Sequence, residues 1–179
     1  EYGAPSIFFV LGQNMESQTN RNLVSLEADS GAYVSVHGYY HATPGGSAFT
    51  AYDWDTINTQ LSQVKVMISS ATGKAPEFFR PPYGVMRKND LDKVVNVLSL
   101  VPVGWTIDTL DWSIRDADEL FAKTTSEISR RGKGIVLMHD IHSQSRQVLL
   151  RLLPWLEEGG YRIVSPQRLL DAFAAAGGQ

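Results

Sequence analysis

Short apolar runs alternate with longer segments of helical periodicity along the whole chain. The runs are rich in β-branched and aromatic residues, whereas the longer segments place apolar residues three or four positions apart. The predicted strands are residues 6–11, 33–36, 77–79, 101–107, 134–138 and 161–164, and the predicted helices are residues 20–30, 55–70, 89–98, 116–131, 145–158 and 166–176. Strict alternation of this kind indicates a parallel sheet covered by helices. The sequence therefore predicts an α/β fold, either a (β/α) barrel or a doubly wound sheet.

Aspartate and glycine residues mark the ends of predicted helices. Asp53 or Asp55 is placed to cap the helix at residues 55–70. Glycine accepts the left-handed backbone that commonly ends a helix. The glycines in this position are Gly31, Gly73 and Gly132. A chain of 179 residues fits one domain, so we expect residues 1–179 to form a single domain.

Composition excludes several classes of partner. The formal net charge is −3 and the pI is about 5.8, and the basic residues form no stripe that could track phosphates, so nucleic acid is not an expected partner. The chain has no cysteine, so any metal must be held by histidine and carboxylate. No apolar run approaches the roughly 20 residues of a membrane span. We therefore expect no membrane-spanning helix.

Four motifs follow predicted strands. Two contain all four histidines of the chain: His37-Gly-Tyr-Tyr-His41 and His139-Asp-Ile-His142. Between them lie Arg80-Pro-Pro-Tyr-Gly84 and Asp108-Thr-Leu-Asp-Trp112. In a (β/α) barrel, the loops that leave the carboxyl ends of the strands carry the chemistry. This placement predicts that the four motifs serve one function.

His37 and His41 have a spacing that can aim two imidazoles at one metal ion. The same spacing is compatible with a structural or solvent-facing pair, so both interpretations remain open from spacing alone. A catalytic zinc usually has three protein ligands and a water. The chain offers several alternatives for a third ligand, namely His142, Asp53, Asp55 and Asp140. Our preferred hypothesis is instead a third ligand that precedes residue 1.

Together with Leu137-Met-His139, these segments resemble four of the five motifs of the polysaccharide deacetylases, the NodB-homology domain or carbohydrate esterase family 4. The fifth motif, Thr-Phe-Asp-Asp-Gly, is absent from residues 1–179. The resemblance implies a distorted (β/α) barrel of the NodB type that lacks its first strand and helix here. Residues 1–5 also look like the last turn and glycine cap of a helix. We therefore expect an upstream segment of the same protein to complete the site.

The resemblance implies a divalent metal, most often zinc, bound by His37 and His41 together with an aspartate of the first motif. Gly38 stands where the family usually has serine or threonine, which removes a side-chain hydrogen bond that could steady the pair. His139 would act as general acid, with Asp111 as the carboxylate that keeps it charged.

Other roles also follow from the resemblance. Arg80 would orient the general base of the first motif. Tyr83 offers the first backbone N–H after two prolines and would stabilise an oxyanion. The residues expected to line the substrate pocket are Pro82, Trp112 and Leu137.

Simpler interpretations accompany these roles. Arg80 could pair with a surface carboxylate at the rim, Asp108 and Asp111 could cap the following helix, and Trp112 and Leu137 could be ordinary core residues. The metal loop is also flanked by aromatic residues that could stack on sugars or simply pack, namely Tyr39, Tyr40, Tyr52 and Trp54.

Three functions are compatible with these features. The first is metal-dependent hydrolysis of N-acetyl groups from N-acetylglucosamine-containing polysaccharide, peptidoglycan in preference to chitin oligomers. The second keeps the metal hydrolase but acts on acetylated xylan or a small cyclic amide. The third is a glycan-binding remnant without turnover. A polysaccharide substrate of this kind implies a periplasmic or extracellular location.

Overall fold

The computed structural model describes residues 3–41 and 48–177. These residues belong to two compact units. One comprises residues 5–41, 48–103 and 164–177 and is called the β1–β4 unit; the other comprises residues 3–4 and 104–163 and is called the β5–β6 unit. The single domain expected from the sequence stays a prediction.

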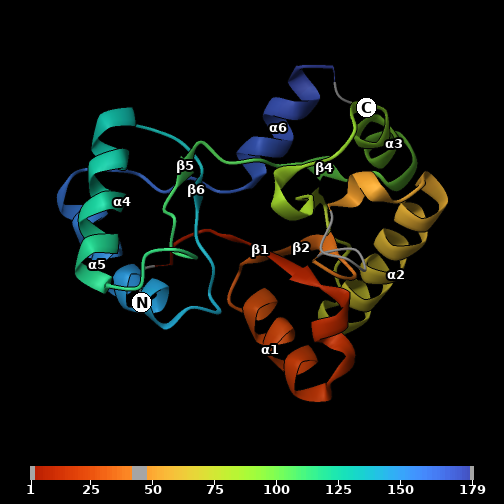
Figure 1. The fold of residues 1–179 in the computed structure, drawn as a ribbon, viewed down its shortest axis with the longest axis horizontal. Coiled ribbons are helices and arrows are strands. Elements are labelled where there is room, and N and C mark those ends of the chain that lie inside the picture. The colour runs from red at the N-terminus through yellow and green to blue at the C-terminus, as the bar shows by residue number, and fades with distance from the viewer. Residues whose placement is uncertain (1–2, 42–47, 178–179) are drawn as a thin grey trace. The chain divides into compact units, whose positions relative to one another are not determined.

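The β1–β4 unit contains a four-stranded parallel sheet in the order β1-β2-β3-β4 (Figure 1). Its strands are β1 (Ile7–Leu11), β2 (Tyr33–Gly38), β3 (Phe78–Phe79) and β4 (Val101–Pro102). Its helices are α1 (Gln18–Asp29), α2 (Trp54–Thr72), α3 (Lys88–Leu98) and α6 (Gln167–Ala175), with 3-10 helices η1 (Gly12–Glu16), η2 (Phe49–Ala51) and η3 (Pro82–Gly84). The predicted α/β class with parallel strands is confirmed.

The β5–β6 unit contains one parallel strand pair and two helices that pack side by side. Its elements are β5 (Ile107–Asp108), α4 (Ala117–Arg131), β6 (Val136–Leu137) and α5 (Ser143–Glu158). Ile107, Ile128 and Leu152 form the centre of its apolar core. Each comes from a different element, so burial of these side chains joins the strand pair to both helices.

The core of the β1–β4 unit lies between the sheet and its helices. The apolar stripe of α2 comprises Ile57, Leu61, Val64 and Ile68, all at most 1% exposed. It packs with Val34 and Val36 of β2 and with apolar residues of α1 and α3. The predicted helical stripe is therefore a core stripe, as the spacing of its residues indicates.

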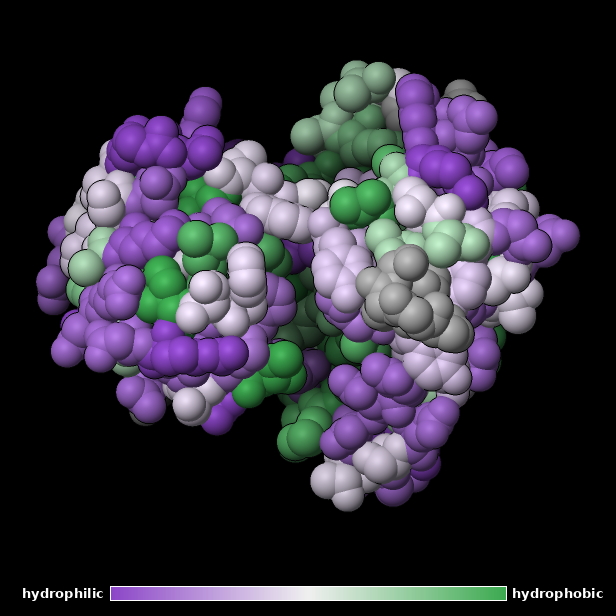
Figure 2. Space-filling view, viewed as in Figure 1, coloured by the Kyte–Doolittle hydropathy of each residue, from purple (hydrophilic) through white to green (hydrophobic). Residues whose placement is uncertain are grey.

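On the face that Figure 2 shows, the surface of each unit is mainly hydrophilic, with hydrophobic residues in small groups.

Caps define several helix ends, and three of them, Asp53, Gly73 and Gly132, are those that the sequence predicts. Asp53 caps α2, because its side chain accepts a hydrogen bond from the Thr56 N–H at 2.8 Å, and Gly73 ends the helix with a left-handed backbone. Asp116 caps α4 by accepting from two N–H groups, and Gly132 ends it in the same conformation. The start of α4 thus needs no cap from the preceding Asp108–Trp112 motif.

The predicted strand at residues 101–107 is wrong as one element. The chain forms β4 and β5 there, and the two strands belong to different sheets. The Val103 N–H bonds to the carbonyl of Phe79 in β3, whereas the N–H groups of Thr106 and Ile107 bond to the carbonyl of Ile135, just before β6. The change of partner occurs at Gly104, where the chain passes from the β1–β4 unit into the β5–β6 unit.

The predicted strand at residues 161–164 is also wrong, since these described residues form no strand. The Tyr161 N–H bonds to the carbonyl of Leu156, and its ring stacks on Trp155 at a centroid distance of 5.5 Å. Tyr161 therefore completes the end of α5 and does not join a sheet.

Two further expectations concern the chain's beginning and the membrane. The expected helix end at residues 1–5 lies partly outside the described residues, although Gly3 does have a left-handed φ of +52°. None of the helices within residues 3–41 and 48–177 is both long and apolar enough to span a bilayer.

Candidate functional site

His37 lies at an irregularity at the end of β2. Val10 and Leu11 of β1 are paired with Val36 and Gly38, so His37 is an extra residue between two pairs. Such a bulge breaks the alternation of side chains and re-aims a residue, which is frequent next to functional sites. The local register therefore singles out the histidine that the motif predicts as a metal ligand.

The ring of His37 is held by the backbone of the next strand. Its Nδ1 lies 2.6 Å from the carbonyl oxygen of Arg80, which follows β3 directly. Because a carbonyl only accepts, Nδ1 carries the proton and donates it, and the lone pair of the neutral ring is on Nε2. This support is of the kind that metal-ligating histidines use, and it does not depend on a side chain at position 38.

His41 is close to both His37 and Tyr83. The centroids of the two imidazoles are 5.2 Å apart, and the His41 ring meets the Tyr83 ring edge-on at 4.6 Å. Two neighbouring imidazoles fit part of the donor set of a zinc ion. The structure thus brings together the predicted ligand pair and the Arg80–Gly84 motif.

No group of three histidine, aspartate or glutamate side chains that could hold a metal ion exists within the described part of the chain. The four alternatives for a third ligand, His142, Asp53, Asp55 and Asp140, therefore complete no such group with the histidine pair. Asp53 is instead used as the cap of α2. A third ligand before residue 1 stays a prediction.

Tyr83 has an uncommon backbone conformation, with φ of 59° and ψ of 4°. The hydrogen bonds of its turn come from the N–H groups of Gly84 and Val85, which donate to the carbonyls of Pro81 and Pro82, so neither uses the Tyr83 N–H. Non-glycine residues held in this region cluster at functional sites. The geometry is compatible with the predicted oxyanion donor.

Arg80 is buried, with 9% of its surface exposed. Its Nε donates to the Val103 carbonyl at 3.0 Å, and its guanidinium lies 4.3 Å from the centroid of the Phe9 ring. Burial lowers the pKa of Arg80 to about 10, so the group is still charged at neutral pH. The simpler interpretation of Arg80 as a surface rim residue is wrong, and a fixed internal cation of this kind can orient a carboxylate.

The β5–β6 unit contains the predicted acid pair. His139 Nδ1 lies 2.7 Å from Asp111 Oδ1, and the His139 backbone N–H donates to Asp111 Oδ2 at 2.6 Å. Asp111 is fully buried. Burial alone would raise the pKa of Asp111, but the hydrogen bonds from His139 and Ser145 hold it below its ordinary value. Asp111 is therefore a buried carboxylate anchored to His139, and its interpretation as a helix cap is wrong.

Sequence reasoning missed the residues that support Asp111. Ser145 Oγ donates to Asp111 Oδ2 at 2.6 Å, and Gln144 Nε2 donates to the Asp111 carbonyl at 2.9 Å. Both come from the first turn of α5 and are buried. A signal did exist, because Ser145 shares a helical face with the core residues Val148 and Leu152, and a polar residue on such a face needs a partner.

Asp108 has a local role. Its Oδ1 accepts a hydrogen bond from the Leu110 N–H at 2.9 Å, which forms a turn within the motif. The same turn gives Leu110 a φ of 59°. Asp108 is thus a turn residue, not a cap of α4.

The residues predicted to line the substrate pocket differ in exposure. Trp112 is 52% exposed, so it is not a core residue, whereas Leu137 is 8% exposed. The Leu137 carbonyl accepts a hydrogen bond from Thr109 Oγ1 at 2.8 Å, which fixes the two motifs to each other within the β5–β6 unit. Pro82 is buried in η3. Their contact with substrate stays a prediction.

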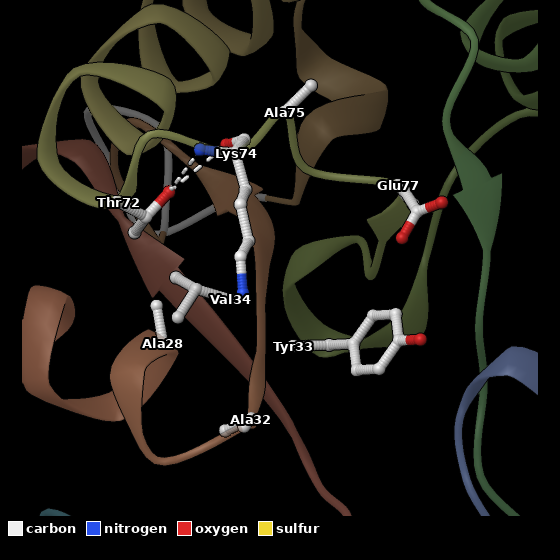
Figure 3. Close-up of a pocket in the computed structure, with 9 residues that line it drawn as sticks. Ala28, Ala32, Tyr33, Val34, Thr72, Lys74, Ala75 and Glu77 are labelled. Atoms are coloured by element: carbon white, nitrogen blue, oxygen red, sulfur yellow. Dashed lines mark hydrogen bonds between the residues drawn. The ribbon is translucent and has the colours of Figure 1, made fainter.

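A hollow of about 310 Å³ lies in the β1–β4 unit, away from the histidine pair. Tyr33 and Val34 at the start of β2 line it, with Lys74 and Glu77 from the segment before β3 (Figure 3). It therefore lies at the opposite end of β2 from His37. In parallel α/β folds this end of the strands serves stability more than chemistry, and we assign it no role in the reaction.

Comparisons with known proteins agree with this geometry. Residues 1–101 match the family model of the polysaccharide deacetylases, and the chain belongs to this family. It is 29% identical over 168 residues to the peptidoglycan-N-acetylglucosamine deacetylase PgdA of Listeria monocytogenes, a match that covers 94% of this chain but 33% of that protein. The chain thus spans about a third of the length of that relative.

Two solved structures share the fold. A family 4 carbohydrate esterase from Streptomyces lividans in complex with acetate superposes with a TM-score of 0.76 and 30% identity, over 93% of this chain and 82% of that one. A pseudoenzyme of the same family from Bacillus anthracis gives a TM-score of 0.78 and 27% identity, over 93% and 56%. The predicted NodB-type α/β fold is confirmed.

Proposed function

We propose that the intact protein removes N-acetyl groups from N-acetylglucosamine-containing polysaccharide in a metal-dependent hydrolysis, with peptidoglycan as the preferred substrate. The observation that carries this proposal is the anchoring of His139 on the buried Asp111 through two hydrogen bonds. A histidine oriented by a carboxylate is suited to give a proton to a leaving group. The similarity to a peptidoglycan deacetylase supports the choice of substrate.

The metal-binding residues in this proposal are His37 and His41. A zinc ion, when bound, supplies a positive charge that polarises the acetyl carbonyl and makes water a better nucleophile. His37 presents Nε2 as the ligand atom because the Arg80 carbonyl holds Nδ1. The third protein ligand and the general base are assigned to the upstream Thr-Phe-Asp-Asp-Gly motif, whose base Arg80 would orient.

The remaining residues act on the substrate. Water adds to the acetyl carbon, its proton goes to the general base, and the backbone N–H of Tyr83 donates to the developing oxyanion. The C–N bond then breaks, and His139 gives its proton to the sugar nitrogen, so that acetate and a free amine leave. Asp111 keeps His139 oriented and charged until this step.

A second candidate is glycan binding without turnover. The structural likeness to a pseudoenzyme of the same family favours keeping this alternative, and the adjacent aspartates of the first motif are absent from residues 1–179. Only the first candidate function, deacetylation, releases acetate.

The experiment is an acetate-release assay with the intact protein on purified N-acetylated peptidoglycan and, in parallel, on chitin oligomers. We expect release from peptidoglycan at a higher kcat/KM than from chitin oligomers. Binding of either glycan with no acetate above the level of the His139→Ala variant would favour the binding module. A cell-envelope or extracellular location is part of the proposal and follows from the substrate.

A further inference from the structure

The loop from His37 to His41 contains Gly38 where a side chain would have no room. A Cβ atom at position 38 would lie 2.7 Å from Cζ of Phe49, closer than real Cβ contacts, and Gly38 has a φ of +135°. The ring of Phe49 therefore occupies the space next to His37 that a serine or threonine would enter. Phe49 is fully buried and belongs to η2, eleven positions beyond Gly38 in the sequence.

Phe49 also contacts the strand that supports His37. Its ring stacks on that of Phe79 with a centroid distance of 6.4 Å. Phe79 immediately precedes Arg80, whose carbonyl accepts the hydrogen bond from His37 Nδ1. The buried ring of Phe49 thus packs against Gly38, which follows His37, and against Phe79, which precedes Arg80.

Arg87 fixes the segment that carries Phe49. Its guanidinium donates to the carbonyls of Thr50, at 3.2 Å, and Tyr52. It also forms an ion pair with Asp90 at 2.5 Å. These bonds connect the turn of η2 to the start of α3. They therefore hold the backbone segment that carries Phe49.

Tyr39, within the loop, attaches it to η1. A Cβ atom at Gly12 would lie 2.6 Å from Cδ2 of Tyr39, so the aromatic ring lies directly against this glycine. The Tyr39 hydroxyl donates to Glu16, and the Tyr39 carbonyl accepts from the Gln13 N–H at 3.0 Å. Each of the two rings therefore lies directly against a glycine: Phe49 against Gly38 of the loop, and Tyr39, within the loop, against Gly12 of η1.

We propose that Phe49 and Tyr39 are positioning residues for the histidine pair, replacing by packing the side-chain hydrogen bond that Gly38 cannot make. The inference rests on the proposed metal site, since its value to the protein is a preorganised pair of zinc ligands. Residues that orient metal ligands typically contribute about 10–100-fold to metal affinity. In this role the two rings would act on zinc binding through the histidine loop.

The test uses the intact protein with Phe49→Leu and Tyr39→Leu, which keep an apolar side chain but remove the ring. Two controls accompany them. Ile68→Ala removes a buried side chain near the far end of α2, and so matches the loss of core packing. Tyr39→Phe keeps the ring and removes only the hydroxyl bond to Glu16.

Two quantities are measured: the zinc Kd by competition with a chelator, and backbone hydrogen exchange at residues 36–41 in metal-free protein. We expect the zinc Kd of the two leucine variants to be higher by at least about 10-fold. We also expect their backbone hydrogens to exchange faster at these residues. Both controls should keep the wild-type zinc Kd and exchange.

Wild-type zinc affinity and exchange in Phe49→Leu and Tyr39→Leu would overturn the positioning role. An equal loss in Ile68→Ala would also overturn it, because the effect would then be one of general stability. If the unsubstituted protein bound no zinc while exchange at residues 36–41 still rose in the leucine variants only, the proposed metal site would be contradicted and the positioning of the loop supported.

Discussion

Asp111 accepts two hydrogen bonds from a single residue, His139: one from the ring Nδ1, at 2.7 Å, and one from the backbone N–H, at 2.6 Å. The first hydrogen bond fixes the orientation of the imidazole ring. The second fixes the backbone at His139, just after β6. Because Ser145 donates to the same carboxylate at 2.6 Å, the position of Asp111 is itself determined by its neighbours. The direction of the imidazole is thereby set from inside the unit.

The charge of Asp111 should appear in the pH–rate profile. In Asp111→Asn the imidazolium loses its counter-charge, so His139 gives up its proton at lower pH. A general acid is active only while protonated, and the alkaline limb of kcat/KM should therefore move to lower pH, with a lower maximum. Asp108→Asn, which alters a turn in the same motif, should leave the profile where it is. Identical alkaline limbs in Asp111→Asn and the unsubstituted protein would remove Asp111 from this role.

His139 should affect the reaction without affecting the metal. We expect His139→Ala to lower deacetylation by about 10²–10⁴-fold, the usual contribution of a positioned general acid. Zinc content, measured by elemental analysis of the purified protein, should not change. Loss of zinc together with activity would identify His139 as a ligand.

For the histidine pair we expect the opposite effect on the metal, namely loss of zinc. Replacing His37 and His41 together by alanine should abolish stoichiometric zinc, because it removes both imidazole donors. His142→Ala is the matched control, since His142 also follows a strand but completes no metal-binding group within the described residues. Equal zinc in the double variant and the control would contradict the assignment.

The lowered pKa of Asp111 should also appear in stability. An unfolded aspartate titrates near pH 3.9, and the folded group titrates lower, so the folded state binds fewer protons in this range. The contribution to stability is therefore complete above the unfolded pKa and is lost as pH falls through the folded pKa. Between pH 5 and pH 3 (about one unit on either side of that unfolded value), the free energy of unfolding should fall more in the unsubstituted protein than in Asp111→Asn. Urea titrations at both pH values measure this difference, and parallel losses would contradict it.

Local signals predicted much of the fold. The stripe of α2 and its Asp53 and Gly73 ends depend on neighbours in sequence, so the amino-acid pattern alone indicates them. The predicted strand at residues 101–107 is wrong as one element because pairing depends on distant partners, such as Ile135, whose carbonyl accepts from the Ile107 N–H. The predicted strand at residues 161–164 is wrong for another reason: Tyr161 bonds to Leu156 and packs on Trp155, so it extends the end of α5, although its apolar pattern also fits a strand.

The site divides in the same way. His37, Arg80, Asp111 and His139 are recognisable because each sits in a motif at the end of a strand. Their supporting contacts are not. The Arg80 carbonyl that holds His37 is a backbone atom with no sequence signature, and Phe49 reaches Gly38 only through tertiary packing.

Metal dependence tests the proposed deacetylation most directly. Acetate release from N-acetylated peptidoglycan is measured with the intact protein after chelation, and again after zinc is restored. We expect release to stop without metal and to return with zinc, and we expect zinc to restore no release in the His37→Ala/His41→Ala variant. Undiminished acetate release by the chelated protein or by that variant would contradict it.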